Sequence, residues 1–393
     1  MKQEIISFLS TVEDELYGIS KYIYENSEES FHENKSCNYL TDLLNNHSFK
    51  IQKRYLNIDT AFKAEFGNGH PKICFLCQYD GIKDMGQIYG YNLQSAISIG
   101  AALGLSNVIS RLGGSVIVIG CPGEILGGSK LTMAHQGAFE DLDIVLAAQP
   151  YTETATGGTS PAVLPLEIKY SNTTIKETFE NHLKLYSPID SCMFTFNAVN
   201  LIIKGFDNIC SIDSVDIHSD SKNKSISQAT ARFLLKTDNI KNAENIKNKI
   251  DYFMNSIEKL LNIDGELHIY DLPCRELIPN NTLNRLLSHN LKEIGIIDIF
   301  GTKNLNSPLS LGNVSHLVPS VNYYINITKD KTIKYGTRDF ALATQTDFAK
   351  DILIKTANAL AITGLDLIEK ESLISEAKME LSSKTNNLTY SLI

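Results

Sequence analysis

Four loops gather the polar side chains of this 393-residue chain that could perform chemistry. They cover residues 78–92, 120–129, 147–158 and 306–315. The first two supply acid, phenol and amide groups from Asp80, Tyr89, Tyr91, Asn92 and Glu124. In an open parallel sheet, ligands bind at the carboxyl ends of the strands. If these loops follow such strands, their side chains meet at one edge of the sheet.

The two carboxylates allow two interpretations each. Glu124 stands in a Gly-flanked turn, GCPGEILGGS, that opens a helix. Free backbone N–H groups at a helix start favour a carboxylate or a bound anion, so Glu124 is either a capping acid or a catalytic base. Asp80, at the end of a strand, is either structural or catalytic.

Other familiar motifs are missing or structural. The nine histidines form no close pair at helix or strand spacing. CFLC (74–77) lies in an apolar strand, where residues three apart face opposite ways, which favours a core role. PGEILGGSK lacks the residue order of a phosphate-binding loop, and neither GxSxG nor HExxH occurs.

The surrounding pattern predicts an α/β fold. Apolar strand-like runs alternate with helical spacing along the first 150 residues, which favours a mainly parallel sheet flanked by helices. The strands are expected at 60–66, 72–79, 115–120 and 143–148, and the helices at 4–25, 36–45, 93–111 and 128–136. The final third returns to this pattern, with a helix at 281–293, a strand at 320–327 and a long helix from 338.

The middle third predicts a different unit. Its strand-like runs are 161–170, 214–219, 229–237 and 265–272, and the helical stripes are Phe194, Ala198 and Leu201, then Ile246, Ile250, Phe253, Ile257 and Leu260. Strand-helix-strand-strand-helix-strand is the ferredoxin-like order. We therefore expect domain boundaries at 1–165, 166–272 and 273–393, with the middle part inserted as a ferredoxin-like α+β domain.

Composition limits the functional classes. A net charge of −9 argues against broad electrostatic binding of nucleic acid. No apolar run approaches the roughly 18 residues of a membrane span, and the first residues lack a signal-peptide pattern. Seven scattered cysteines are typical of free thiols in a reducing compartment, so we expect a cytoplasmic protein without membrane or nucleic-acid partners.

At the four loops, the sequence resembles the dinuclear-zinc peptidases and amidohydrolases, which include aminoacylases, carboxypeptidases and p-aminobenzoyl-glutamate hydrolase. The similar segments span most of the chain: YIYENSEESFHENKSCNYLTDLLNNHSFKI, TAFKAEFGNGHPKICFLCQYDGI, YGYNLQSAISIGAALGL, GGSVIVIGCPGEILGGSK and SLGNVSHLVPSV. The resemblance implies a zinc-peptidase-like catalytic domain with the inserted unit as its lid and dimerisation domain. It also implies a homodimer, or a heterodimer with an intact relative. Because an exposed edge strand or an apolar helix stripe on a small inserted domain must be covered, we expect the strand 229–237 or the helix 193–204 to build a two-fold contact.

The same comparison predicts that the metal ligands are replaced. Family members bind zinc through a Cys and a His in "CGHN", the second Glu of "PAEE", a His before Pro and a late His. The matching positions hold Tyr89, Tyr91, Ile125, Gln149 and Gly336. Zinc requires three or four thiolate, imidazole or carboxylate ligands, so we expect neither metal nor another cofactor.

Part of the family's site is retained. The resemblance equates Glu124 with the general base and Asp80 with an acid that orients a metal ligand; Asn92 is also kept. His182 corresponds to a lid histidine, and Ser310 replaces a family Asp. With Tyr89, Tyr91, Asn92 and Gln149, these two are the predicted ligand-binding residues.

Three functions remain open at this point. The favoured one is a metal-free homologue that binds a small amino-acid-like or acyl-amino-acid ligand, or acts as a regulatory partner subunit. The tyrosines can instead plug the site and leave an inert scaffold. The third is a metal-independent amidohydrolase or aminoacyl-processing enzyme that uses Glu124 or Asp80, whereas residual zinc-dependent activity has the least support.

Overall fold

The computed structural model describes residues 1–171, 187–206, 210–223 and 226–390. The chain divides into two compact units. The first comprises Met1–Thr159, Leu277–Asn304 and Asn313–Ile393, and the second comprises Ser160–Glu276 and Leu305–Gly312. The expected boundary at 165/166 falls inside a strand of the second unit, and the short return segment 305–312 has no counterpart in the expected boundaries.

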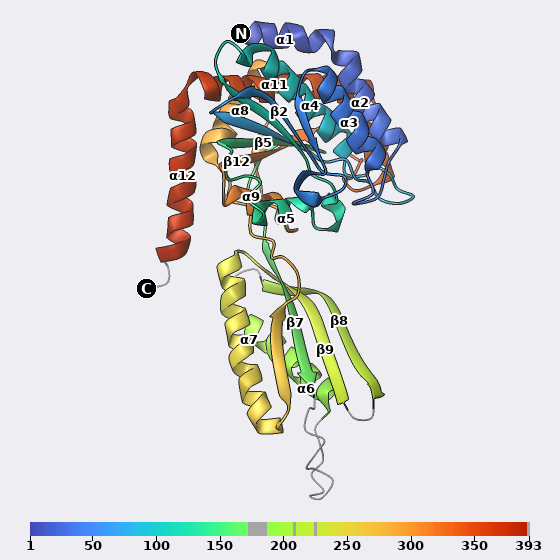
Figure 1. The fold of residues 1–393 in the computed structure, drawn as a ribbon, viewed down its shortest axis with the longest axis vertical. Coiled ribbons are helices and arrows are strands. Elements are labelled where there is room, and N and C mark those ends of the chain that lie inside the picture. The colour runs from blue at the N-terminus through green and yellow to red at the C-terminus, as the bar shows by residue number, and fades with distance from the viewer. Residues whose placement is uncertain (172–186, 207–209, 224–225, 391–393) are drawn as a thin grey trace, which may run out of the picture. The chain divides into compact units, whose positions relative to one another are not determined.

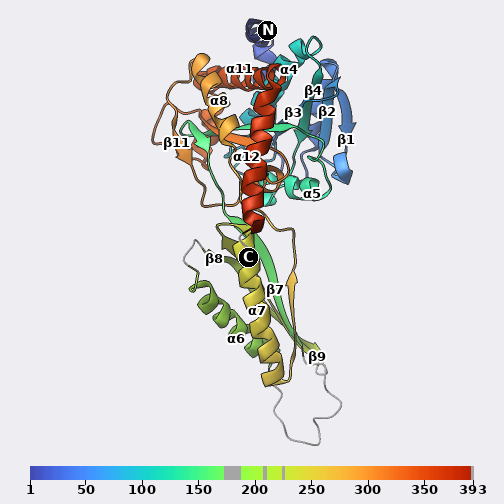
Figure 2. The same ribbon diagram turned by 90° about the vertical axis from the view of Figure 1, so that its left-hand side faces the viewer.

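The first unit (Figure 1) contains an eight-stranded sheet in the order β1-β2-β4-β3-β5-β12-β6-β11, with β1 and β11 at opposite edges (Figure 2). Its strands are β1 (Lys50–Lys53), β2 (Phe62–Asn68), β3 (Lys72–Cys77), β4 (Gly114–Gly120), β5 (Ile144–Tyr151), β6 (Ala155–Gly157), β11 (Phe300–Lys303) and β12 (Ser320–Asn326). The four central strands, β4, β3, β5 and β12, are parallel to one another. Nearly all of their residues are buried, as expected for strands covered on both faces.

Helices cover this sheet and confirm the predicted α/β class. They are α1 (Lys2–Thr11), α2 (Glu13–Glu25), α3 (Asn34–Asn46), α4 (Tyr91–Ile109), α5 (Ser129–His135), α8 (Asn281–Glu293), α9 (Leu311–Ser315), α10 (Arg338–Ala343), α11 (Asp347–Glu369) and α12 (Glu371–Tyr390), with single 3-10 turns at Tyr55–Asn57 and Glu124–Leu126. The expected helix 4–25 is two helices, because the backbone leaves the helical conformation at Val12 (φ −110°, ψ 12°).

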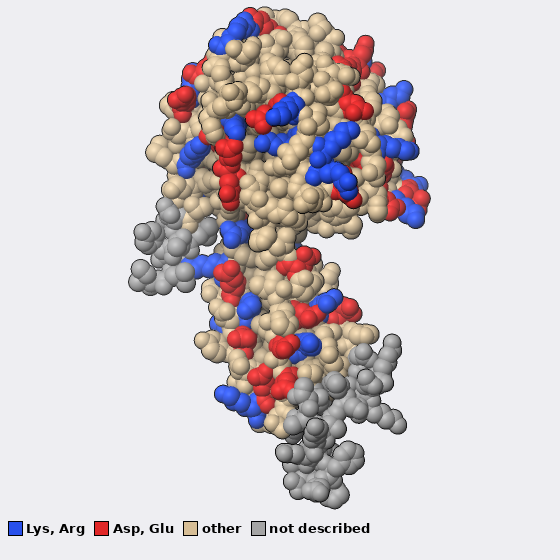
Figure 3. All heavy atoms as spheres, viewed as in Figure 1, with Lys and Arg blue, Asp and Glu red and all other residues tan. Residues whose placement is uncertain are grey.

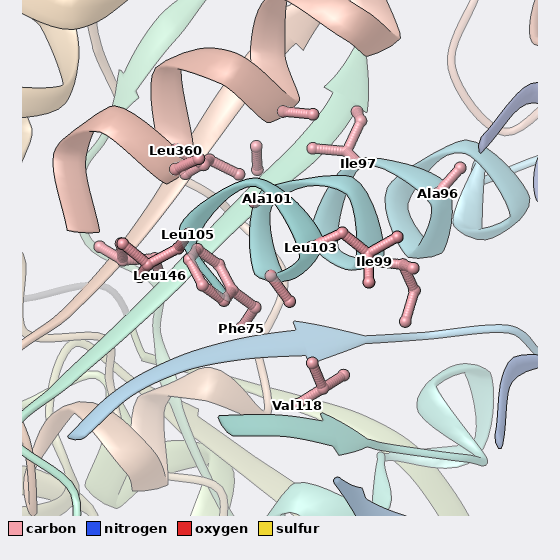
Figure 4. Packing of buried hydrophobic residues seen from close by; sticks show 14 of the residues in the cluster. Phe75, Ala96, Ile97, Ile99, Ala101, Leu103, Leu105, Val118, Leu146 and Leu360 are labelled. Carbon is pink, nitrogen blue, oxygen red and sulfur yellow. The ribbon is translucent and has the colours of Figure 1, made fainter. Parts of the chain in front are cut away.

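The helix α4 lies at the centre of the first unit and carries the candidate site at its N-terminus. It is buried on all sides, and Figure 4 shows its side chains among Phe75, Val118, Leu146 and Leu360. Gly100 and Gly104 let neighbouring helices approach closely. A Cβ atom at Gly100 would lie 2.9 Å from Leu16 Cδ1 and 3.0 Å from Ala357 Cβ, so any larger residue would force the helices apart.

The second unit has the predicted ferredoxin-like order. Its elements are β7 (Ala162–Ser171), α6 (Pro188–Ile203), β8 (Cys210–Asn223), β9 (Ile226–Thr237), α7 (Ile240–Leu261) and β10 (Asp264–Ile269). The antiparallel sheet has the order β10-β7-β9-β8. Alternate β7 residues from Leu164 to Tyr170 are buried, and so are most residues of the predicted α7 stripe.

Two details of this unit differ from expectation. The strand β9 (229–237 in the sequence-based prediction) pairs with β7 and β8 on its two sides, so it is not an edge strand and cannot offer its backbone to a second chain. In α6, the predicted stripe points outward: Phe194 is 54% exposed and Leu201 is 72% exposed. The buried side of α6 instead carries Cys192 and Val199.

Lys and Arg side chains are interspersed with Asp and Glu on the face shown in Figure 3. Among the described residues, no helix is long and apolar enough to cross a membrane.

Candidate functional site

The loops that follow β3, β4, β5 and β12 lie at the carboxyl edge of the parallel strands of the first unit. This edge holds the positions that the resemblance matches to metal ligands. The Gln149 side-chain amide donates to the Tyr89 carbonyl (2.8 Å), and the rings of Tyr89 and Tyr91 are 6.0 Å apart. A Cβ atom at Gly336 would lie 3.4 Å from Tyr89 Cε1. The backbone N–H of Ile125 donates to Asp80 (2.9 Å), whose charge acts on the Tyr91 phenol.

Asp80 is a buried carboxylate whose hydrogen bonds connect three loops. Its Oδ2 atom accepts hydrogen bonds from the Ser30 hydroxyl (2.8 Å) and from the backbone N–H of Ile125 (2.9 Å). The residue is 1% exposed, and Oδ1 has no hydrogen-bond partner. Burial, opposed by these two hydrogen bonds, raises the pKa of Asp80 to about 6. Asp80 therefore supports the turn that contains Glu124 and keeps one oxygen unsatisfied.

Glu124 lies in the turn after β4, which Gly123 opens with a left-handed backbone (φ +72°). Its carboxylate forms an ion pair with Lys130 of α5, and the two side chains are 5% and 1% exposed. The ion pair places the carboxylate next to a buried cation, and the two groups compensate each other.

Glu33 is a third buried acid at this turn, and sequence reasoning missed it. Its carboxylate accepts hydrogen bonds from the backbone N–H groups of Gly123 (2.8 Å) and Phe31 (2.9 Å) and from the Thr60 hydroxyl (2.7 Å). Burial raises its pKa despite these bonds. Glu33 directly precedes α3, where an acid usually signals only a helix cap, so its spacing gives no indication of a site.

The phenol rings at this edge form a connected cluster that is larger than the predicted pair. Tyr335 contacts both Tyr89 and Tyr151, with ring centroids 5.3 and 4.7 Å apart. Tyr324 and Phe340 extend the chain of contacts. Burial raises the pKa of Tyr91 well above its ordinary value, and the nearby Glu124 charge adds to this effect. The Tyr91 phenol therefore remains neutral at physiological pH.

The other three predicted ligand-binding residues, Asn92, Ser310 and His182, are not part of the tyrosine cluster. The Asn92 side chain donates to the Ser20 hydroxyl (2.9 Å) and the Thr344 hydroxyl (3.0 Å), so it joins α4 to α2 and to the end of α10. Ser310 is 5% exposed and belongs to the second unit. His182 lies outside the described residues.

The residues at this edge do not fit a zinc site. The five positions provide two neutral phenols, one amide and two side chains without a donor atom, whereas zinc requires thiolate, imidazole or carboxylate ligands. Within the described ranges, no three His, Cys, Asp or Glu residues are grouped so that they could hold a metal ion.

Comparisons with known proteins identify relatives of the whole chain, although no protein-family model matches it. The chain is 25% identical to the Xaa-Arg dipeptidase of Mus musculus, over 98% of this chain and 93% of the relative. It is 22% identical to one of the subunits of the p-aminobenzoyl-glutamate hydrolase of Escherichia coli, over 84% and 76% of the two chains. A dinuclear metal-binding peptidase of the M20 family from Bacillus subtilis has a similar fold, with a TM-score of 0.61 at 13% identity over 88% of this chain and 98% of that chain.

Proposed function

We propose that this chain, a homologue of the dinuclear-metal peptidases and amidohydrolases of the M20 family, is a metal-free protein that binds a small amino-acid-like or acyl-amino-acid ligand. One observation carries the proposal. At two positions where family members have metal ligands, the rings of Tyr89 and Tyr91 stand 6.0 Å apart and continue into a cluster with Tyr335. This match, in which phenol rings replace metal-ligand side chains, supports a metal-free protein.

Metal-dependent hydrolysis has little support from the residues that remain. Zinc lowers the pKa of a bound water from 15.7 to about 7, a difference of roughly 9 units or about 12 kcal/mol. A single carboxylate base cannot supply that free energy. Glu124, the residue matched to the family's base, is moreover paired with Lys130 inside the protein.

A metal-independent hydrolase is the second candidate, and the ionisation of Asp80 favours it. A carboxyl group with a pKa of about 6 can donate or accept a proton near neutral pH. Its free Oδ1 atom would have to reach the substrate. The two candidates differ in whether a bound compound is also hydrolysed, so binding and hydrolysis can be measured on the same set of compounds.

The test combines three measurements on the full chain. Elemental analysis of the purified protein is expected to find no stoichiometric zinc. Titration calorimetry with N-acetyl amino acids and small dipeptides is expected to detect binding, and amine-release assays on the same compounds are expected to detect no hydrolysis. Release of product that is lost in Asp80→Asn would favour the second candidate. One or two zinc ions per chain with chelator-sensitive hydrolysis would overturn the proposal.

We further propose that the chain forms a homodimer, or a heterodimer with an intact relative, through the second unit. The inner position of β9 leaves α6 as the predicted contact element, and the exposure of Phe194 and Leu201 supports this choice. Large apolar side chains on one helix face are commonly covered by a partner.

A further inference from the structure

Phe31 is an exposed aromatic residue in an unfavourable backbone conformation. Its φ angle is +64°, and 42% of the residue is accessible to solvent. The His32 N–H donates to the Glu29 carbonyl (3.0 Å), which closes a turn with Phe31 at its third position. A positive φ at this position favours glycine or asparagine, because a bulky side chain is crowded there. Neither the turn geometry nor burial of the ring therefore explains a phenylalanine at this position.

The ring of Phe31 lies against the turn that contains Glu124. A Cβ atom at Gly123 would lie 2.3 Å from Phe31 Cζ, so the end of the ring rests on the Gly123 backbone. Leu126, two residues after Glu124, is 72% exposed. This turn therefore presents accessible apolar surface next to a candidate site residue.

Two buried carboxylates fix Phe31 relative to this turn. Glu33 Oε1 accepts hydrogen bonds from the backbone N–H groups of both Phe31 (2.9 Å) and Gly123 (2.8 Å). Asp80 Oδ2 connects the residue before Phe31 to the residue after Glu124 in the same way (2.8 and 2.9 Å). Strained backbone conformations persist where the surrounding contacts over-determine them, and they are concentrated at active sites and ligand-binding segments.

We propose that Phe31 is a specificity-determining residue whose exposed ring binds the apolar acyl group of the ligand beside Glu124. This inference rests on the proposed ligand-binding function and specifies which residue recognises the acyl part of the ligand. Removal of apolar surface from water stabilises a complex in proportion to the area covered, so affinity should increase with the length of the acyl chain.

The test compares N-acetyl-L-alanine with N-hexanoyl-L-alanine, which differ only in acyl length, by titration calorimetry. Burial of roughly two methylene groups corresponds to about ten-fold in affinity, so we expect the hexanoyl compound to bind at least about ten-fold more tightly. In Phe31→Asn this preference should fall close to one. Asparagine tolerates a left-handed backbone, so this variant is expected to fold. Phe300→Asn, the same substitution at a 61% exposed position of β11, is the matched control and should keep the preference.

A fluorescence measurement reports directly on contact at Phe31. The chain contains no tryptophan, so Phe31→Trp introduces a single reporter. Saturating N-hexanoyl-L-alanine should shift its emission to shorter wavelength, whereas N-acetyl-L-alanine should not. Equal affinity of the wild type for the two compounds, or an unchanged preference in Phe31→Asn, would overturn this inference and leave the proposed function intact. If no acyl amino acid or dipeptide binds, both proposals are wrong.

Discussion

Lys130 and Glu124 form an ion pair in which both side chains are almost completely shielded from solvent, at 1% and 5% exposure. A buried pair is costly to break, because the remaining partner keeps an uncompensated charge. Lys130 thus compensates the charge of the buried Glu124 carboxylate and occupies its Oε2 atom.

Removing one member of this pair should destabilise the protein strongly. Lys130→Met leaves the Glu124 carboxylate buried without its cation, and we expect a loss of about 3–5 kcal/mol in the free energy of unfolding. The double variant Lys130→Met with Glu124→Gln should recover a large part of that loss, since it leaves no buried charge at the pair. Urea denaturation of the wild type, both single variants and the double variant measures the coupling. Additive effects would show that the two side chains do not interact.

Chelation should leave the stability of the protein unchanged. A metal ion that binds the native state raises the melting temperature by mass action, and its removal lowers it. Because Tyr89, Tyr91, Ile125, Gln149 and Gly336 provide no thiolate, imidazole or carboxylate, we expect equal melting temperatures with EDTA and with added zinc. A drop of several degrees with EDTA would restore the metallohydrolase interpretation.

The stability contributed by Asp80 should depend on pH in a defined direction. Its pKa rises from 3.8 to about 6 on folding, so the native state binds the proton more tightly than the unfolded state. Stability attributable to Asp80 is therefore present below pH 4 and decreases as pH rises from about 4 to 6, by roughly 3 kcal/mol in total.

The variant Asp80→Asn removes this dependence. Relative to the wild type, it should be more stable at pH 8 than at pH 4.5, and urea denaturation at both values measures the difference. Asp84→Asn, which changes an exposed residue in the same loop, is the control and should show no such trend. An Asp80→Asn effect that is independent of pH would contradict a raised pKa.

The sequence predicted the sheet and its buried strands well, because uninterrupted apolar runs such as 115–120 and 143–148 have one stable environment between two helical layers. It missed β1, β6 and β11, which are only three or four residues long and lie at or near the sheet edge. The side chains of β1 and β11 are largely exposed, so hydrophobic spacing carries little information there.

The sequence predicted the site residues that stand in loops at strand ends, but not those that come from distant segments. Asp80, Glu124, Tyr89 and Tyr91 stand in loops at strand ends, where the topology alone brings residues together. Tyr151, Tyr324 and Tyr335 join the cluster from segments up to 246 positions away from Tyr89 in sequence (335 minus 89), and single aromatic residues are usually core residues. The outward direction of Phe194 was missed because α6 is apolar around most of its surface, so its spacing does not identify the buried side.

The exposed face of α6 yields the final prediction. Phe194 (54% exposed) and Leu201 (72% exposed) lie seven residues apart, which places them on the same side of the helix. If a partner chain covers this side, light scattering at micromolar concentration will give twice the monomer mass of 43.6 kDa. The double variant Phe194→Glu with Leu201→Glu should shift the protein to the monomer, since the charges would have to be desolvated at the contact.

Met379→Glu, at a 66% exposed position of α12, is the matched control and should leave the dimer intact. A wild-type monomer at these concentrations would show that α6 is not a contact between copies of this chain, and binding to an intact relative would then be the remaining form of the assembly proposal to measure.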